Sequence, residues 1–218
     1  MPTAPPREDL VKQIESVGLV AIIRANASTG LIETCRALAE GGVTVAEITM
    51  TTPGAIDAIA AAHTELRDQI LVGVGSVLDA ETAHHAIEAG AEFVVSPVFR
   101  PEVIEAAHAR GKPVFAGAFT PTEIHAAFAA GSDLVKVFPA NHLGPRFFKD
   151  VLAPMPQLRL TPTGGVSLET IPDWFAAGAR CVGVGSSLVQ KELVQAQDWA
   201  GLTRLAGQYV EAVRLARG

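Results

Sequence analysis

The feature that most constrains this chain is a regular alternation of short β-branched runs with Ala-rich stretches of helical character. The runs are Leu19–Arg24, Val43–Met50, Ile70–Val74, Phe93–Ser96, Pro113–Ala116, Leu134–Phe138, Leu158–Thr161 and Cys181–Val184. The stretches between and after them are Ile32–Glu40, Ala55–Leu66, Ala80–Ala89, Pro101–Ala109, Thr122–Ala130, Pro145–Leu152, Leu168–Ala177 and a last one from Trp199 to about Leu215. Repeated strand–helix units predict a parallel sheet with crossover helices. Because the runs are apolar on both faces, we expect a sheet that is buried on both faces.

The number of units points to an α/β fold of the (β/α)8 TIM-barrel type, with an open doubly wound sheet as the alternative. Glycine follows an Ala-rich stretch in the segments Glu40–Gly42, Glu88–Phe93, Ala109–Pro113, Ala129–Asp133 and Ala176–Arg180. Glycine takes the left-handed conformation of a helix C-cap, so we assign these glycines a structural role. The segment Arg7–Val17 predicts an extra N-terminal amphipathic helix that covers the bottom of the barrel.

Size and composition favour one compact domain over residues 1–218. The length suits one α/β barrel, and 49% apolar with 18% charged residues provides for a large core rather than disorder. The net charge of −6 without a basic run argues against nucleic acid and anionic membranes as partners. Charges, Gly or Pro interrupt every apolar stretch, and Met1–Asp9 has no apolar segment of the signal-peptide kind. We therefore expect a cytoplasmic location.

A lysine inside the apolar run Leu134–Phe138 is the clearest sign of chemistry. Catalytic residues of such barrels lie at the C-terminal ends of the strands. Burying an ammonium group is costly, and desolvation favours the neutral amine, which is the form that attacks a ketone to give an imine. Strand alternation puts Leu134, Lys136 and Phe138 on one face, which projects Lys136 into the barrel if that face is inward. The alternatives are a structural ion pair and a solvent-reaching lysine.

A carboxylate in the second run is the other candidate for catalysis. Glu47 shares its strand face with Val45, Thr49 and Thr51. Inside a barrel it would serve as a general base, directly or through water. The alternative is a plain buried ion pair with Lys136.

Two glycine-rich turns follow the seventh and eighth runs, in Thr161–Val166 and Val184–Ser187. Turns at these two places, with exposed backbone N–H groups, form the usual phosphate site of such barrels. The predicted phosphate-binding residues are Gly164, Gly165, Gly185 and Ser186. The alternative is that the glycines only serve tight turns that need a positive φ.

Three further residues at strand ends are weaker candidates: Ser76 to hold a carboxylate, Pro97 to wall the site, and Arg24 to meet an anion. The six histidines fall in predicted helices or loops without metal-ligand spacing, so we predict no metal site. Cys35 and Cys181 lie among apolar neighbours and are expected to be buried reduced thiols.

Taken together, these segments resemble the 2-keto-3-deoxy-6-phosphogluconate (KDPG) aldolase family, which includes 4-hydroxy-2-oxoglutarate aldolase activity. The resemblance runs from about Leu19 to Val189. It rests on the segments GGVTVAEITMTTP, ILVGVGSVL, AGAEFVVSP, LVKVFPA, TPTGGV and VGVGSSLV in this order.

The resemblance implies a class I aldolase of the Entner–Doudoroff pathway that needs no cofactor. It would bind pyruvate and a phosphorylated keto acid and would form a homotrimer. It implies the following roles: Lys136 forms the imine, Glu47 transfers protons, Ser76 holds the pyruvate carboxylate, Thr163 contacts the substrate, Phe138 and Pro97 wall the pocket, and Gly164, Gly165, Gly185 and Ser186 bind phosphate.

One position departs from the family pattern. Many members carry an arginine four residues after the glutamate, where it binds the keto-acid carboxylate, whereas this chain has Thr51, as some branches do. The carboxylate would then be bound by Arg24, Ser76 and backbone N–H groups. KDPG is the expected substrate, with the phosphogalactonate epimer or 4-hydroxy-2-oxoglutarate as alternatives. A non-catalytic barrel that binds a phosphorylated metabolite, or serves as a scaffold, is the second alternative.

Overall fold

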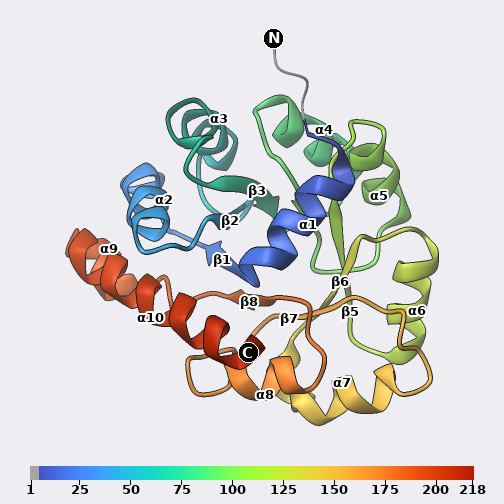
Figure 1. Ribbon diagram of the computed structural model, residues 1–218. Coiled ribbons are helices and arrows are strands. Elements are labelled where there is room, and N and C mark those ends of the chain that lie inside the picture. Colours follow the sequence, from blue (N-terminus) through green and yellow to red (C-terminus); the bar gives the residue numbers. More distant parts are fainter. Residues whose placement is uncertain (1–4) are drawn as a thin grey trace.

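The strands form a closed parallel barrel. The computed structural model describes residues 5–218 (Figure 1). The strands are β1 (Leu19–Ile23), β2 (Val45–Thr49), β3 (Leu71–Gly75), β4 (Val94–Val95), β5 (Val114–Ala118), β6 (Leu134–Val137), β7 (Leu160–Pro162) and β8 (Val182–Val184). They pair in the order β7-β6-β5-β4-β3-β2-β1-β8, and a parallel bridge between Thr163 and Gly183 joins the two outer members. The barrel prediction is therefore confirmed over the open sheet.

Helices surround the barrel, one after nearly every strand, as predicted. They are α1 (Arg7–Val17), α2 (Leu31–Glu40), α3 (Ala55–Leu66), α4 (Ala80–Glu88), α5 (Pro101–His108), α6 (Pro121–Ala129), α7 (Gly144–Leu152), α8 (Ile171–Ala176), α9 (Lys191–Gln195) and α10 (Trp199–Arg217). One glycine after each of α2, α4, α5, α6 and α8 has positive φ, which confirms its structural role: Gly42, Gly90, Gly111, Gly131 and Gly178. Gly41 has a φ of −80° instead. The short helix α9 and the 3-10 turn η1 (Ala140–His142) were not predicted.

The predicted helix Leu168–Ala177 begins three residues late. The segment Ser167–Thr170 instead forms a turn in which the Ser167 N–H donates to the Thr170 hydroxyl (2.9 Å). A side chain that bonds a nearby backbone group competes with the helix in this way.

The helix α1 closes the bottom of the barrel, as the sequence predicts, and crosses it in front in Figure 1. Its Val11 and Ile14 pack with inward-facing residues at the starts of the strands. Those residues are Val20, Val45, Phe93, Val95, Phe115, Leu134 and Cys181. The lower half of the barrel is thus filled with apolar side chains, and polar groups are left for its upper half.

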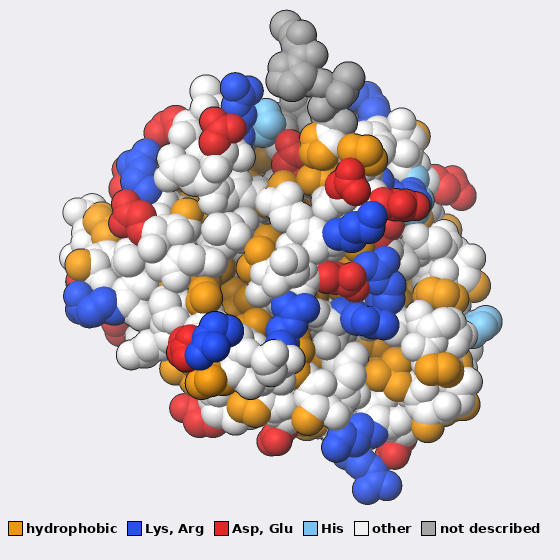
Figure 2. Space-filling view, in the orientation of Figure 1, with side chains coloured by type: hydrophobic (Ala, Val, Ile, Leu, Met, Phe, Trp, Pro, Cys, Tyr) orange, Lys and Arg blue, Asp and Glu red, His pale blue; other side chains and the backbone are white. Residues whose placement is uncertain are grey.

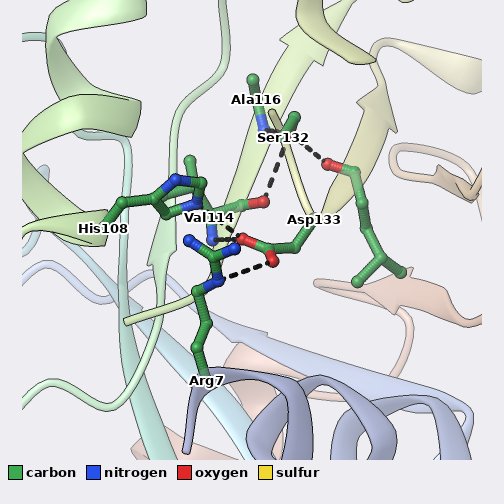
Figure 3. Close-up of polar contacts among 7 residues, drawn as sticks. Arg7, His108, Val114, Ala116, Ser132 and Asp133 are labelled. Atoms are coloured by element: carbon green, nitrogen blue, oxygen red, sulfur yellow. Dashed lines mark hydrogen bonds and ion pairs between the residues drawn. The ribbon is translucent and has the colours of Figure 1, made fainter. Parts of the chain in front are cut away.

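Asp133, directly before β6, ties α1 to the barrel wall (Figure 3). Its Oδ2 accepts from the Val114 N–H (2.9 Å) and lies 3.0 Å from His108 Nε2, while its Oδ1 pairs with Arg7 Nε (3.2 Å). The neighbouring Ser132 hydroxyl accepts from the Ala116 N–H (2.9 Å). These bonds fix β6 against β5 three residues before Lys136.

The two thiols behave as expected. Cys35 and Cys181 are free and buried, and burial raises the pKa of each thiol to about 12. Within residues 5–218, no cluster of three or more His, Cys, Asp or Glu side chains has a metal-binding arrangement, and no helix is long and apolar enough to cross a membrane. On the face that Figure 2 shows, basic and acidic side chains are intermingled.

Candidate active site

Lys136 and Glu47 meet inside the barrel. Lys136 lies on the inner face of β6 and is 6% exposed, and Glu47 on β2 is 2% exposed. The Lys136 Nζ is 3.6 Å from Glu47 Oε1, and this oxygen makes no hydrogen bond with any described residue. The solvent-reaching alternative for Lys136 is therefore wrong. At this distance an amine and a carboxylate can exchange a proton through one bridging water, and the free oxygen of Glu47 can accept a bond from a substrate hydroxyl.

Glycines on the neighbouring strands allow close contacts around this pair. A methyl group at Gly75, on β3, would lie 2.6 Å from Glu47 Oε1. A methyl group at Gly117, the β5 partner of Lys136, would lie 2.1 Å from the carbonyl carbon of Pro97. Sequence reasoning missed both glycines. The signal that reveals them is a glycine at an inward position of a strand, where close approach of another group is the usual reason.

Above the pair, a pocket of about 760 Å³ opens at the C-terminal ends of β1, β7 and β8. It brings together seven of the predicted residues: Arg24, Phe138, Thr163, Gly164, Gly165, Gly185 and Ser186. Lys136 and Glu47 do not line it, because they lie deeper in the barrel. Phe138, which lines the pocket, also lies near the buried pair, since Lys136 Nζ is 5.5 Å from the centre of its ring.

The glycines of the two turns differ in what they require. Gly164 and Gly165 have φ of 94° and 74°, so backbone conformation alone accounts for them. Gly185 lies outside the left-handed region, and a methyl group there would come no closer than 4.0 Å to Ile22. Neither strain nor packing demands glycine at 185. Its bare backbone on the pocket wall supports the close approach of a ligand.

The remaining predicted residues lie around Glu47 rather than in the pocket. Ser76 follows Gly75 directly and has a left-handed backbone, with φ of 62°. Such a conformation is uncommon for a residue other than glycine and is often found at functional sites. The main chain of Pro97 covers Gly117, next to Lys136. The predicted site is thus divided between a deep part and an outer part.

Thr51 is exposed, and its hydroxyl lies 2.9 Å from that of Thr49 on β2. Thr52 continues this chain of hydroxyl groups, because its Oγ1 accepts from the Ala25 N–H (3.1 Å). No cationic side chain therefore stands at the position four residues after Glu47.

A buried lysine and glutamate in contact, below two glycine-rich turns in a (β/α)8 barrel, point to an enzyme of the aldolase class, a carbon–carbon lyase. The family model described as KDPG and KHG aldolase matches residues 10–205. The chain belongs to this family.

Relatives and solved structures agree with that assignment. A 2-dehydro-3-deoxy-phosphogluconate aldolase of Treponema pallidum is 34% identical over 94% of this chain and 97% of its own length. A structure described as native KDPGal has a TM-score of 0.84 and 30% identity, covering 91% of this chain and 95% of that one. A KDPG aldolase of Legionella pneumophila, with pyruvate captured as a covalent carbinolamine, has a TM-score of 0.82 and 27% identity, covering 89% and 97%.

Proposed function

We propose that this chain is a class I aldolase that cleaves KDPG to pyruvate and glyceraldehyde 3-phosphate through a Schiff base on Lys136. The observation that carries the proposal is the buried contact of 3.6 Å between Lys136 Nζ and Glu47 Oε1. A desolvated amine beside a carboxylate is the arrangement that imine chemistry requires.

The substrate spans the two parts of the site. Its phosphoryl group occupies the turns that contain Gly164–Gly165 and Gly185–Ser186, which line the pocket and would offer backbone N–H groups to an anion. Its carboxylate lies near Ser76, and Thr163 and Phe138 contact the carbon chain between them. Pro97 and Thr51 border the deep part, and Arg24 adds a positive charge at the pocket.

The first half of the reaction forms the electron sink. The uncharged Lys136 amine attacks the C2 carbonyl carbon and gives a carbinolamine. Loss of water then leaves an iminium between Nζ and C2. No metal or cofactor is needed, because the iminium accepts the electrons that the cleaved bond releases.

The second half moves protons through Glu47. Its carboxylate takes the proton of the C4 hydroxyl, the C3–C4 bond breaks, and its electron pair passes into the iminium to give an enamine. Glyceraldehyde 3-phosphate leaves. Glu47 returns the proton to C3, and water hydrolyses the iminium to release pyruvate and the free lysine.

The test is pyruvate release from KDPG, its phosphogalactonate epimer and unphosphorylated 4-hydroxy-2-oxoglutarate. The phosphate turns predict a higher kcat/KM for KDPG than for 4-hydroxy-2-oxoglutarate. Release of pyruvate from none of the three substrates would overturn the proposal.

The nearest second candidate is the same chemistry on the phosphogalactonate epimer or on 4-hydroxy-2-oxoglutarate. Thr51 leaves the choice among the three substrates open, because the keto-acid carboxylate that an arginine would bind beside Glu47 is common to all of them. The similarity to the KDPGal structure supports this second candidate. A higher kcat/KM for either compound than for KDPG would select it. The presence of Lys136 and Glu47, in contact with each other, argues against the non-catalytic alternative.

We further propose that residues 1–218 act as one domain in a cytoplasmic homotrimer of the Entner–Doudoroff pathway. Three large apolar side chains after neighbouring strands support self-association: Leu78 (52% exposed), Val98 (45%) and Phe119 (38%). Large exposed apolar side chains at one end of a barrel are typical of contact surfaces.

A further inference from the structure

The pocket does not end at the phosphate turns. It continues into a space that we call the outer chamber, between the β1–α2 loop on one side and the segment from α9 to the start of α10 on the other. The outer chamber is lined by Ala27, Leu31, Val189, Lys191, Val194 and Trp199. The whole pocket, at about 760 Å³, has the size of pockets that enclose drug-sized ligands, roughly 300–1,000 Å³.

Trp199 is held rigidly at the end of this chamber. Its backbone N–H donates to the carbonyl of Gln197 (2.9 Å), and the Asp198 side chain caps α10 by accepting from the Gly201 N–H (2.8 Å). A methyl group at Gly30 would lie 3.1 Å from Cη2 of Trp199, so the indole packs on the main chain of the opposite wall. The indole therefore reaches across to the opposite wall and contributes aromatic surface to the lining of the pocket.

The charged side chains of the pocket suit a ligand with an anionic group at one end. Arg24 and Lys191 both line it, and no Asp or Glu does. Neither cation forms an ion pair with a carboxylate among residues 5–218. The mostly apolar chamber would bury a second phosphoryl group at a cost, because a charged group needs hydrogen-bond partners. An aromatic ring matches the apolar lining of the chamber better.

We propose that the outer chamber binds the ring of an aromatic phosphomonoester, such as a nucleoside 5′-monophosphate, while its phosphoryl group occupies the glycine turns. The proposal rests on the phosphate assignment of the proposed function. The ring stacks on Trp199, and the side-chain amides of Asn26 and Gln195, which also line the pocket, supply donors and acceptors for its edge. Such a ligand competes with the substrate for the phosphate turns.

Fluorescence tests the proposal directly, because the chain has two tryptophans. Trp174 is 3% exposed and packs on Phe148, so a ligand-dependent change reports Trp199. We expect adenosine 5′-monophosphate to quench the emission in a saturable way and to inhibit pyruvate release competitively. Its Ki should be about tenfold or more below that of inorganic phosphate, as stacking of one base predicts. Adenosine alone should bind more weakly than the monophosphate.

Variants separate the chamber from the phosphate turns. Trp199→Ala is expected to raise the Ki of adenosine 5′-monophosphate by about tenfold and to leave that of inorganic phosphate nearly unchanged. Ala27→Trp fills the chamber from the opposite wall and should have the same selective effect, which keeps the test valid if Trp199→Ala fails to fold. Arg204→Ala, an exposed change on α10 outside the pocket, is the matched control and should alter neither Ki.

Equal Ki values for the monophosphate and inorganic phosphate would overturn the outer-chamber proposal and leave the proposed function standing. Binding without any change in Trp199 emission would overturn it too. If the enzyme released pyruvate from no substrate, the proposed function would fail, and the fluorescence titration would still decide whether the chamber binds the ring.

Discussion

At the scale of single residues, the site depends on what surrounds Lys136 and Glu47 as much as on the pair itself. Both groups are almost fully buried, and the carboxylate Oε1 has no hydrogen-bond partner among the described residues. A buried carboxylate oxygen without a hydrogen bond is costly, so it is available for the bond with a substrate hydroxyl that the proposed mechanism requires. The inward glycine Gly75 leaves the space that the Glu47 carboxylate occupies.

Glu47→Gln tests the carboxylate. The amide has the same shape but does not accept a proton, so we expect kcat to fall by about 100-fold or more, as loss of a general base does. The Schiff base with pyruvate should still form, because Lys136 is intact. A variant with wild-type kcat would contradict the proton-transfer role of Glu47.

Gly75→Ala tests the space beside that carboxylate. The added methyl group would lie 2.6 Å from Glu47 Oε1 and must displace it, so we expect a large fall in kcat with a smaller change in KM. Gly207→Ala, on α10, is the matched control, because its methyl group would come no closer than 3.9 Å to any atom beyond the adjoining helix backbone. Equal activity of the two variants would show that the position of the carboxylate is not critical.

At the scale of elements, α1 supports the site by filling the bottom of the barrel. Its apolar face completes the inner cluster below Lys136, and Arg7 binds Asp133 at the start of β6. The helix therefore stabilises the strand that carries the lysine without touching the pocket at the other end.

Ile14→Ala measures this contribution. The side chain is fully buried, so removing it is expected to cost about 2–5 kcal/mol of unfolding free energy, as other buried large-to-small substitutions do. The substitution Gln13→Ala, at the exposed neighbouring position, should cost little. Urea denaturation of both variants checks the difference, and equal midpoints would show that α1 does not close the barrel.

The sequence predicted the strands and helices better than the pocket and the close contacts between them. Periodic runs and helix-ending glycines identify the strands and most helices, and Lys136 and Glu47 are conspicuous because apolar strands seldom carry charges. The short helix α9 has too few residues to show a period, so the outer wall of the pocket was missed. The roles of Gly75 and Gly117 depend on contacts with residues far along the chain, which alternation alone does not reveal.

At the scale of the whole molecule, the two ends of the barrel have separate tasks. The lower end is closed by α1 and apolar side chains, and the upper end holds the proposed catalytic pair, the glycine-rich turns and the outer chamber. The exposed apolar side chains after β3, β4 and β5 lie at this same upper end, and the proposed trimer would cover them.

Phe119→Asp tests that assembly. A charge placed in an apolar contact is costly to bury, so we expect the variant to sediment as a single chain of 22.7 kDa and the unmodified protein at three times that mass. Leu215→Asp, at an exposed apolar position on α10, is the control and should leave the assembly intact. A single-chain mass for the unmodified protein would exclude the trimer.

The central claim is that Lys136 forms the Schiff base, and borohydride reduction in the presence of pyruvate tests it most directly. Peptide mass analysis should find the reduced pyruvate adduct on Lys136 and no adduct in Lys136→Ala. An adduct on another lysine, or one that persists in Lys136→Ala, would contradict the account.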